Sequence, residues 1–180
     1  MLQFRQIKPN EYDLIQTHII NSFNLKDFES LVAPFEIIVG EGRWKEILLI
    51  SEQMVKVFRN IKKYRNPYFM GIFFGDIKKN KFKISLEGIT LISNYVEEKT
   101  VLTDSGEKKV LYGRNLTKQD LLHIPTRIKK NKLSILTNKN GEVLALGEYL
   151  VEREKINTLN GNTEIIKNII DKGWYLRKGK

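Results

Sequence analysis

The sequence predicts an α+β protein made of two small domains. Its 180 residues suit one large domain or two small ones, and a hydrophobic content of 41% is enough for folded cores. The hydrophobic pattern also changes near the middle, from helices and hairpins to closely spaced short strands. We place the boundary at the polar, non-periodic stretch Val96–Lys99. This gives an N-terminal mixed α/β domain with an antiparallel sheet over residues 1–95 and a small β barrel over residues 96–180.

The first domain is expected to begin with two helices. Apolar residues at helical spacing predict a helix over Glu11–Phe23, with Asn10 as its N-cap and Asp13 in the position of a capping-box acid. A shorter helix is expected over Lys26–Val32 and should end near Pro34, because the residue before a proline is disfavoured in the helical conformation.

Two hairpins and two more helices are expected to complete this domain. Strands Phe35–Val39 and Trp44–Ile50 flank the turn Gly40–Arg43, and Ser51 then caps a helix. The apolar stripe of that helix, which we interpret as core, is Met54, Val57, Phe58 and Ile61. The second hairpin joins Pro67–Phe74 to Phe82–Leu86 through a basic tip over Gly75–Lys81, and a short helix over Ile89–Tyr95 closes the domain.

The second domain has shorter elements. A strand is expected over Lys99–Thr103, followed by a helix that begins at Asp104 or Ser105 and ends near Gly113. The stretch Leu116–Ile128 is mixed and is broken by Pro125. Further segments are a strand at Lys132–Thr137, an Asn-Gly turn at Asn138–Gly141, a strand at Glu142–Val151 and an apolar segment at Ile165–Ile170.

Composition narrows the function classes. The chain carries 31 basic and 21 acidic residues, a formal net charge of +10, with the excess shared between the two domains. Such a field attracts polyanions, although a lysine-rich surface of a thermophilic archaeal protein is an equal alternative. The absence of cysteine excludes disulfides and thiolate metal sites, and we expect no cofactor. We see neither a signal peptide nor a membrane-spanning segment, and expect a soluble, cytoplasmic protein.

We expect no enzymatic activity. Cysteine is absent and the two histidines, His18 and His123, are far apart in sequence, so a nucleophile with its base is not supported. We interpret His18 as a structural or exposed helix residue and His123 as a loop residue. The sequence also lacks the glycine-rich phosphate-binding motifs of nucleotide-binding enzymes.

The second domain resembles PUA domains, which are RNA-binding pseudo-barrels. The resemblance is carried by Thr103–Lys109 leading into Leu111–Gly113, then Val143–Gly147 and Asp171–Arg177. Upstream, three further segments are similar to the N-terminal domain of the nuclear import protein seven family of ribosome-biogenesis factors, namely Leu49–Lys56, Gly71–Ile77 and Lys81–Ile89. The resemblance covers roughly Lys45 to the end of the chain, and the family has archaeal members.

The resemblance implies a non-catalytic factor that acts in large-subunit ribosome assembly and pre-rRNA processing. It implies RNA binding through the PUA domain, with a preference for uridine-rich single strands, and contacts with ribosome-assembly proteins and the exosome. The sequence departs from many PUA domains at Asn131-Lys132, where a Gly-Asp pair is common, and at Trp174, where an acidic residue often follows the glycine. We expect a monomer.

The expected RNA-binding residues are basic, since phosphate contacts require Lys and Arg. The resemblance implies the first helix of the PUA domain and the segment after the Gly147 strand. Together with the other basic clusters, this gives Lys108, Lys109, Arg114, Lys130, Lys132, Arg153, Lys155, Arg177 and Lys178. Each could instead be an ordinary solvated side chain: Lys108 has Asp104 at helical spacing, and Arg153 lies between two glutamates.

Two further groups of residues remain open as RNA contacts. We interpret most of the aromatic residues of the second domain as core, with Trp174 the leading exception; the four are Tyr112, Tyr149, Trp174 and Tyr175. The first domain has its own basic residues, interpreted as the wet face of a helix or, alternatively, as part of an RNA track across both domains: Arg59, Lys62, Lys63, Arg65, Lys78, Lys79, Lys81 and Lys83.

Three functions therefore compete. The chain is an RNA-binding assembly factor, an RNA-specificity subunit or regulator for an RNA-modifying or RNA-degrading complex such as the exosome, or a protein adaptor whose charge is incidental. Co-sedimentation with pre-ribosomal particles separates the first two, and the salt dependence of RNA affinity separates both from the third.

Overall fold

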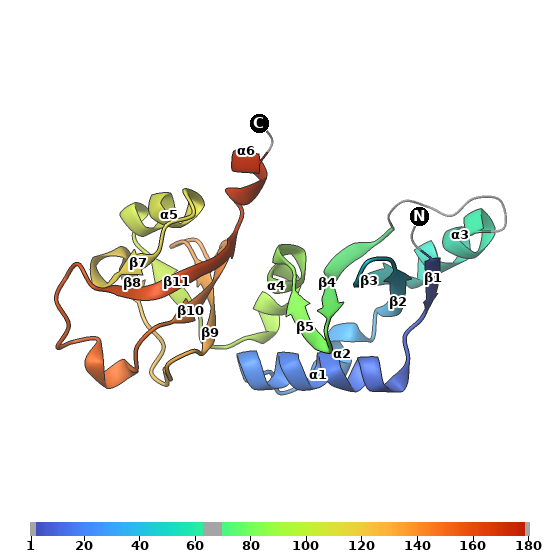
Figure 1. Cartoon of the computed structure of the whole chain (residues 1–180), viewed down its shortest axis with the longest axis horizontal. Coiled ribbons are helices and arrows are strands. Elements are labelled where there is room, and N and C mark those ends of the chain that lie inside the picture. The colour runs from blue at the N-terminus through green and yellow to red at the C-terminus, as the bar shows by residue number, and fades with distance from the viewer. Residues whose placement is uncertain (1–2, 63–69, 179–180) are drawn as a thin grey trace. The chain divides into compact units, whose positions relative to one another are not determined.

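The computed structural model describes residues 3–62 and 70–178, except for the side chains of Lys62 and Lys178. The expected basic residues Lys63 and Arg65, and the start of the strand expected at Pro67, lie outside the described residues. The chain divides into two compact units, Met1–Tyr95 and Val96–Lys180, which Figure 1 shows in blue to green and in yellow to red.

The first unit is built on a five-stranded antiparallel sheet with the order β1-β2-β3-β4-β5. Its strands are β1 (Gln3–Gln6), β2 (Phe35–Glu41), β3 (Lys45–Ser51), β4 (Ile72–Lys78) and β5 (Lys81–Ile84). Sequential neighbours pair throughout, so the sheet is a meander. Because every second turn of a meander lies at the same end of the sheet, the β2–β3 and β4–β5 turns share one end.

Four helices accompany the sheet of the first unit: α1 (Pro9–Phe23), α2 (Phe28–Val32), α3 (Glu52–Lys62) and α4 (Leu86–Ile92), the last followed by the 3-10 turn η1 (Ser93–Tyr95). Helix α1 packs on one sheet face, where His18 meets Phe82 of β5 with ring centroids 5.5 Å apart. Helix α3 packs on the other face, where Val55 and Phe58 join the cluster that contains Leu48 and Ile50 of β3.

Helix α1 begins earlier than expected. Its N-cap is Lys8, not Asn10, and Pro9 occupies the first helical position, where its fixed φ and missing N–H suit a helix start. The acid at the third position is Glu11, not Asp13, and its carboxylate accepts the backbone N–H of Lys8 at 3.1 Å. Glu11 is buried and also accepts hydrogen bonds from Arg5 and Lys45, so contacts distant in sequence fix this start.

The expected core stripe of the third helix is largely wrong. Phe58 is buried, but Met54, Val57 and Ile61 are each at least 40% exposed, and Val55 takes the second buried position. The sheet decides this orientation, because Phe58 packs edge-to-face on Phe4 of β1, with ring centroids 5.7 Å apart.

The β4–β5 hairpin is tighter than the expected seven-residue tip. Strand β4 continues to Lys78 and β5 starts at Lys81, so only Lys79 and Asn80 form the turn, both with positive φ. Gly75 lies inside the strand rather than in the turn. A Cβ at this position would lie 2.2 Å from the Lys83 carbonyl oxygen, so the close approach of β5 requires glycine here.

The second unit contains a six-stranded mixed sheet that curls into a nearly closed pseudo-barrel, with the order β7-β11-β10-β9-β6-β8. The strands are β6 (Thr100–Leu102), β7 (Leu116–Thr117), β8 (Leu121–His123), β9 (Leu133–Thr137), β10 (Val143–Tyr149) and β11 (Glu164–Asp171). Only β6 and β9 pair in parallel among the described strands. The two units together confirm the predicted α+β class, an antiparallel sheet with helices followed by a β pseudo-barrel.

Helices α5 (Asp104–Leu111) and α6 (Trp174–Lys178), with the 3-10 turns η2 (Lys118–Asp120) and η3 (Arg153–Lys155), complete the second unit. Thr103 caps α5 by accepting the Gly106 N–H at 3.1 Å, and Gly113 follows the helix with φ 77°, as expected for a C-terminal glycine. The core centres on Tyr149, whose hydroxyl is hydrogen-bonded to Thr100 at 2.5 Å; Thr100 is in turn bonded to Ser134 at 2.8 Å.

Candidate nucleic-acid interface

The expected RNA-binding residues fall into two groups near opposite ends of β10. The helix-end cluster contains Lys108, Lys109, Arg114 and Arg177, and the loop cluster contains Lys130, Lys132, Arg153 and Lys155. The pairing of the strands shows where each group lies. Arg177 binds Asp171, which is paired with Ala145 near the start of β10. Asn131, between Lys130 and Lys132, forms a backbone hydrogen bond with Tyr149 at the end of β10. In Figure 1, α5 and α6 lie at one end of the unit and the orange turn around η3 at the other.

Two members of the helix-end cluster have structural partners. Lys109 donates to the carboxylate of buried Asp120 at 2.8 Å, and Thr117 donates to the same carboxylate through its N–H and hydroxyl. Burial alone would raise the pKa of Asp120, but these hydrogen bonds outweigh it and hold the pKa below its ordinary value. Lys109 therefore neutralises a buried acid of its own domain.

Arg177 holds helix α6 in place. Its guanidinium donates two hydrogen bonds of 2.9 Å to buried Asp171 and a third to the Leu111 carbonyl at the end of α5. The backbone at position 173 lies so close to the end of α5 that only glycine fits, since a Cβ there would lie 1.9 Å from the Leu111 carbonyl oxygen. The Asp171–Arg177 motif thus locks the C-terminal segment to the first helix of the unit.

The remaining members of the helix-end cluster face solvent. Lys108 and Arg114 are exposed, and neither has a carboxylate partner among the residues that the structure describes. Lys108 and Asp104 form no ion pair within 4.0 Å in the described structure, because Asp104 binds Lys139 at 2.8 Å instead; the charge of Lys108 still helps to lower the pKa of Asp104. Lys108 and Arg114 are therefore the cations that this end can offer to a phosphate; the side chain of Lys178 lies outside the described part of the chain.

The loop cluster joins two segments that are far apart in sequence. The Asn131 N–H donates to the Tyr149 carbonyl at 2.7 Å, and the Tyr149 N–H donates to the Lys132 carbonyl at 3.0 Å. A weaker 3.4 Å bond runs from the Arg153 N–H to the Ile128 carbonyl. These backbone bonds hold the segment before β9 against η3.

The charges of the loop cluster are mostly uncompensated. Lys155 lies 4.0 Å from Glu152, the upper limit for an ion pair between these exposed side chains. Arg153, for which neutralisation by its glutamate neighbours was the alternative to an RNA contact, has no ion pair within the described ranges, and neither do Lys130 and Lys132. Exposed Arg127 and Lys129 flank them. Among the described residues, this end of the unit therefore has more cations without an ion pair than the helix end has.

Three of the four aromatic residues interpreted mainly as core are exposed. Tyr149 is buried, but Tyr112 is 72%, Tyr175 53% and Trp174 42% exposed. The reason is local: the Asp171–Arg177 motif ends in a helix rather than a barrel strand, and Tyr112 lies beyond Val110, the last buried residue of α5. These rings add an aromatic surface beside the helix-end cluster.

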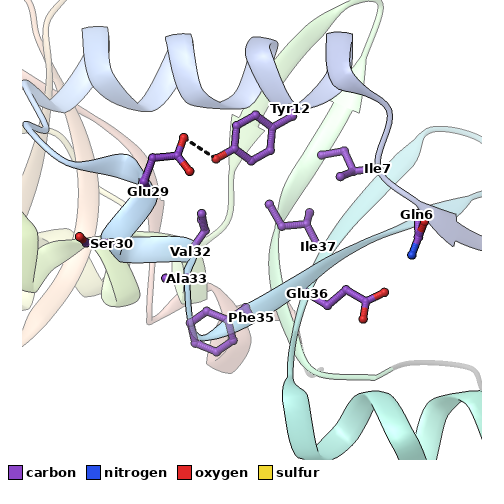
Figure 2. Close-up of a pocket in the computed structure, with 10 residues that line it drawn as sticks. All are labelled: Gln6, Ile7, Tyr12, Glu29, Ser30, Val32, Ala33, Phe35, Glu36 and Ile37. Carbon is purple, nitrogen blue, oxygen red and sulfur yellow. Dashed lines mark hydrogen bonds between the residues drawn. The ribbon is translucent and has the colours of Figure 1, made fainter.

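The first unit contains a groove of different character. Figure 2 shows it between the start of α1, α2 and the start of β2, with a volume of about 610 Å³. Among the described residues, its lining includes the apolar side chains Ile7, Val32, Phe35 and Ile37 and the carboxylates Glu29 and Glu36, but no Lys, Arg or His. The Tyr12 hydroxyl donates a hydrogen bond to Glu29 at 2.7 Å, as drawn in Figure 2. Burial makes the larger contribution and this hydrogen bond a smaller one, and together they raise the pKa of Tyr12 to about 12. The second carboxylate, Glu36, lies 3.6 Å from the guanidinium of Arg59.

Neither histidine belongs to a group of possible metal ligands in the described part of the chain. His18 packs against Phe82, and burial lowers its pKa, while His123 is an exposed residue of β8. Across residues 3–62 and 70–178, no three His, Asp or Glu side chains gather closely enough to hold a metal ion. No helix of the described residues is long and apolar enough to span a bilayer.

The sequence identified Lys78 among the basic residues of the first domain, but it did not reveal that Arg43 and Trp44 lie beside it. Arg43 lies 5.5 Å and the Lys78 ammonium 5.1 Å from the centre of the Trp44 ring, so the β2–β3 turn meets the β4–β5 turn. The sequence placed Arg43 in an ordinary turn and Trp44 in a strand. The signal that was overlooked is the meander itself, which places these two turns at one end of the sheet.

Comparisons with known proteins agree with this architecture. The family model for the NIP7/UPF0113 pre-PUA domain matches residues 4–86, and the model for the UPF0113 PUA domain matches residues 98–180. A UPF0113 protein of Archaeoglobus fulgidus is 24% identical over 99% of this chain and 97% of its own length.

Two further similarities extend this comparison. A 60S ribosome subunit biogenesis protein, the NIP7 homologue of Dictyostelium discoideum, is 25% identical over 73% of this chain and 74% of its own. The crystal structure of a hypothetical protein from Pyrococcus horikoshii, at 14% identity, shares the fold with a TM-score of 0.64 over 97% of this chain and 99% of its own. The two models follow each other along the chain in the order pre-PUA, then PUA, and the protein is therefore a member of the NIP7/UPF0113 family.

Proposed function

We propose that this protein is a non-catalytic RNA-binding factor that acts in biogenesis of the large ribosomal subunit and in pre-rRNA processing. The relatives named as 60S biogenesis proteins support the process, and the PUA domain supports RNA as the ligand. The observation that carries the proposal is the loop cluster, where two segments held together by backbone bonds present four cations, of which only Lys155 has a carboxylate within 4.0 Å among the described residues.

The loop cluster is the better candidate for the primary RNA contact. Structural pairing engages Lys109 and Arg177 at the helix end, which leaves Lys108 and Arg114 there. The loop cluster keeps four cations, of which only Lys155 approaches a carboxylate. Each phosphate neutralised on a single strand releases about 0.7 counterions, so the end with more available cations should dominate the salt dependence of binding. Exposed aromatic rings at the helix end would stack on bases of a longer strand.

Paired charge reversals test this placement. Lys132→Glu/Arg153→Glu should weaken binding of fluorescein-labelled oligouridine more than Lys108→Glu/Arg114→Glu, in anisotropy titrations of the full chain. Circular dichroism confirms that each variant is folded. Equal affinities of wild type and both variants would refute the placement in the PUA domain.

The regulatory alternative, a specificity subunit for an RNA-modifying or RNA-degrading complex such as the exosome, predicts a different assembly. An assembly factor should co-sediment with pre-ribosomal particles in sucrose gradients of native extract. Migration with a smaller enzyme complex, and absence from the particles, would favour the alternative.

We propose further that the groove of the first unit binds an assembly protein through a segment rich in arginine and apolar residues. Its two carboxylates and apolar walls complement such a segment, although Arg59 approaches Glu36 at 3.6 Å. A labelled octapeptide alternating Arg and Leu should bind the full chain, its Asp–Leu counterpart should not, and Glu29→Lys/Glu36→Lys should abolish binding. Equal binding of the Arg–Leu peptide to wild type and variant would exclude the groove.

A further inference from the structure

The first unit carries a second basic surface at one end of its sheet. We define the hairpin-tip cluster as Arg43, Trp44, Lys78, Lys79 and Lys81. The cross-strand register of β3, β4 and β5 pairs Lys45 with Ile77 and Lys78 with Lys81, which brings the β2–β3 and β4–β5 turns together. The two cation–π distances to Trp44, 5.5 Å from Arg43 and 5.1 Å from Lys78, confirm that the turns meet.

The lysines of this cluster point away from the core. Side chains alternate along a strand, and buried Phe82 and Ile84 of β5 lie on the face that α1 covers. Lys81 and Lys83 therefore lie on the opposite face, together with their cross-strand partners Lys78 and Asp76. Helix α3 covers only part of that face, where Phe58 packs with Leu48 and Ile50, so the end near the turns stays open to solvent.

Acidic residues compensate only part of this charge. The carboxylates of this face that lie nearest the tip are Glu46 and Asp76, which are opposite each other across β3 and β4, one row back from the tip. Glu36 lies on the same face at the other end of β2, where Arg59 approaches it at 3.6 Å. Asp76 is also directly opposite Lys83. None of the four tip cations has a carboxylate within 4.0 Å among the described residues, whereas neighbouring Arg5 and Lys45 are both engaged with Glu11.

The arrangement of the tip works against its own stability. Lys78 and Lys81 are directly opposite each other, and like charges in that position destabilise a hairpin. Lys79 has φ 50° and Asn80 φ 56°, so both central residues of the two-residue turn are left-handed. Asn or Gly suits such a turn, and Lys does not. Local conflicts of this kind concentrate at functional sites, and a bound polyanion would relieve the repulsion.

We propose that the hairpin-tip cluster is a second phosphate-binding site, which engages the backbone of the RNA bound by this protein. Trp44 holds Arg43 and Lys78 around one ring, and the turn adds Lys79 and Lys81 from the next strand. The ligand chemistry is a run of phosphates, because the site offers four cations from two neighbouring turns and, among the described residues, no carboxylate within 4.0 Å of them. The identity of the polyanion as RNA rests on the proposed function; the site itself rests on the hairpin geometry.

The test uses two substitutions that should not harm folding. Lys79→Asn places a residue favoured in the left-handed conformation, and Lys81→Thr removes the like-charge pair and suits a strand. Binding of a fluorescein-labelled 30-nucleotide oligouridine to the full chain is measured at several salt concentrations. The matched control is Lys56→Gln, which removes one exposed charge from α3 of the same unit.

The double variant should reduce the slope of log affinity against log salt by about 1.4, for two lost single-strand phosphate contacts. If the affinity extrapolated to 1 M salt is unchanged, this corresponds to roughly 25-fold weaker binding at 0.1 M salt. Each single variant should lose roughly 5-fold, and Lys56→Gln should bind as wild type does.

Other outcomes overturn the proposal in distinguishable ways. Wild-type affinity of the double variant, with loss in Lys132→Glu/Arg153→Glu, would refute the tip site and leave the proposed function intact. Failure of the wild-type chain to bind the oligouridine would refute the proposed function itself. Vesicles containing phosphatidylserine provide a final arm: if the double variant loses vesicle binding but keeps RNA binding, the phosphates belong to a lipid surface and the RNA assignment is wrong.

Discussion

Replacing Glu11 with Gln should destabilise the first unit and change its response to acid. The Glu11 carboxylate is buried and accepts hydrogen bonds from the Arg5 guanidinium at 2.7 and 2.8 Å, from the Lys45 ammonium at 2.6 Å and from the Lys8 N–H at 3.1 Å. The bonds from Arg5 contribute most, and together with those from Lys45 and Lys8 they overcome the effect of burial and lower the pKa of Glu11 to about 2.

The magnitude follows from linkage between protonation and folding. A pKa that falls from 4.5 in the unfolded chain to about 2 in the folded chain corresponds to roughly 3 kcal/mol of stability at neutral pH. Because the folded-state pKa is the lower one, this contribution is fully present above about pH 4.5 and is lost as the pH falls towards 2. The Gln variant lacks the ionisable group, so its deficit should shrink over the same range.

Urea unfolding measures this difference. A Trp174→Phe background leaves Trp44 as the only tryptophan, so fluorescence reports on the first unit. At pH 7, Glu11→Gln should lower the free energy of unfolding by about 3 kcal/mol. Asp13→Asn, on the exposed side of the same helix, should change it by less than about 0.5 kcal/mol. A deficit below about 1 kcal/mol at pH 7, or an equal deficit at pH 7 and pH 3, would refute the role of the network.

Three further predictions concern the PUA domain. Tyr149→Phe should lower its stability by roughly 1–3 kcal/mol, because the buried hydroxyl of Thr100 loses a partner; thermal melts followed by circular dichroism measure this, and an unchanged melting temperature contradicts it. Gly173→Ala should loosen helix α6, since the new Cβ would lie 1.9 Å from the Leu111 oxygen; increased amide hydrogen exchange in α6 is the readout, and wild-type protection would count against the contact. Lys109→Met should lower the urea midpoint because it leaves buried Asp120 without its cation, while oligouridine affinity changes little in the folded protein; loss of affinity without loss of stability would show that Lys109 contacts RNA.

Local pattern predicts most elements of this chain. Helical spacing predicted α1, and alternating strands with an Asn-Gly turn predicted β9 and β10, because these signals are carried by consecutive residues. The predicted bounds and faces of elements are wrong where contacts between residues distant in sequence determine them. The start of α1 depends on Arg5 and Lys45, which meet Glu11 only in the folded sheet.

The candidate site shows the same division. Residue type identified the basic residues, but their grouping depends on strand register, which places the loop cluster and the helix-end cluster near opposite ends of β10. Lys109 and Arg177 pair with buried acids and are therefore not available to a ligand. These pairs, too, could be recognised only from the folded structure. Asp120 is 11 residues from Lys109, and Asp171 is 6 residues from Arg177. Neither separation matches the three- or four-residue spacing at which side chains meet on a helix, so the sequence did not reveal either pair.

The most direct test of the central claim is the salt dependence of RNA binding by the unmodified chain. Affinity for a labelled uridine-rich single strand is measured from low to high salt and compared with an adenosine-rich strand of equal length. If the four cations of the loop cluster contact phosphates, log affinity should fall linearly with log salt with a slope of about −2.8 or steeper, and the uridine-rich strand should bind more tightly. Binding with a slope near zero, or no binding at low salt, would contradict direct RNA recognition.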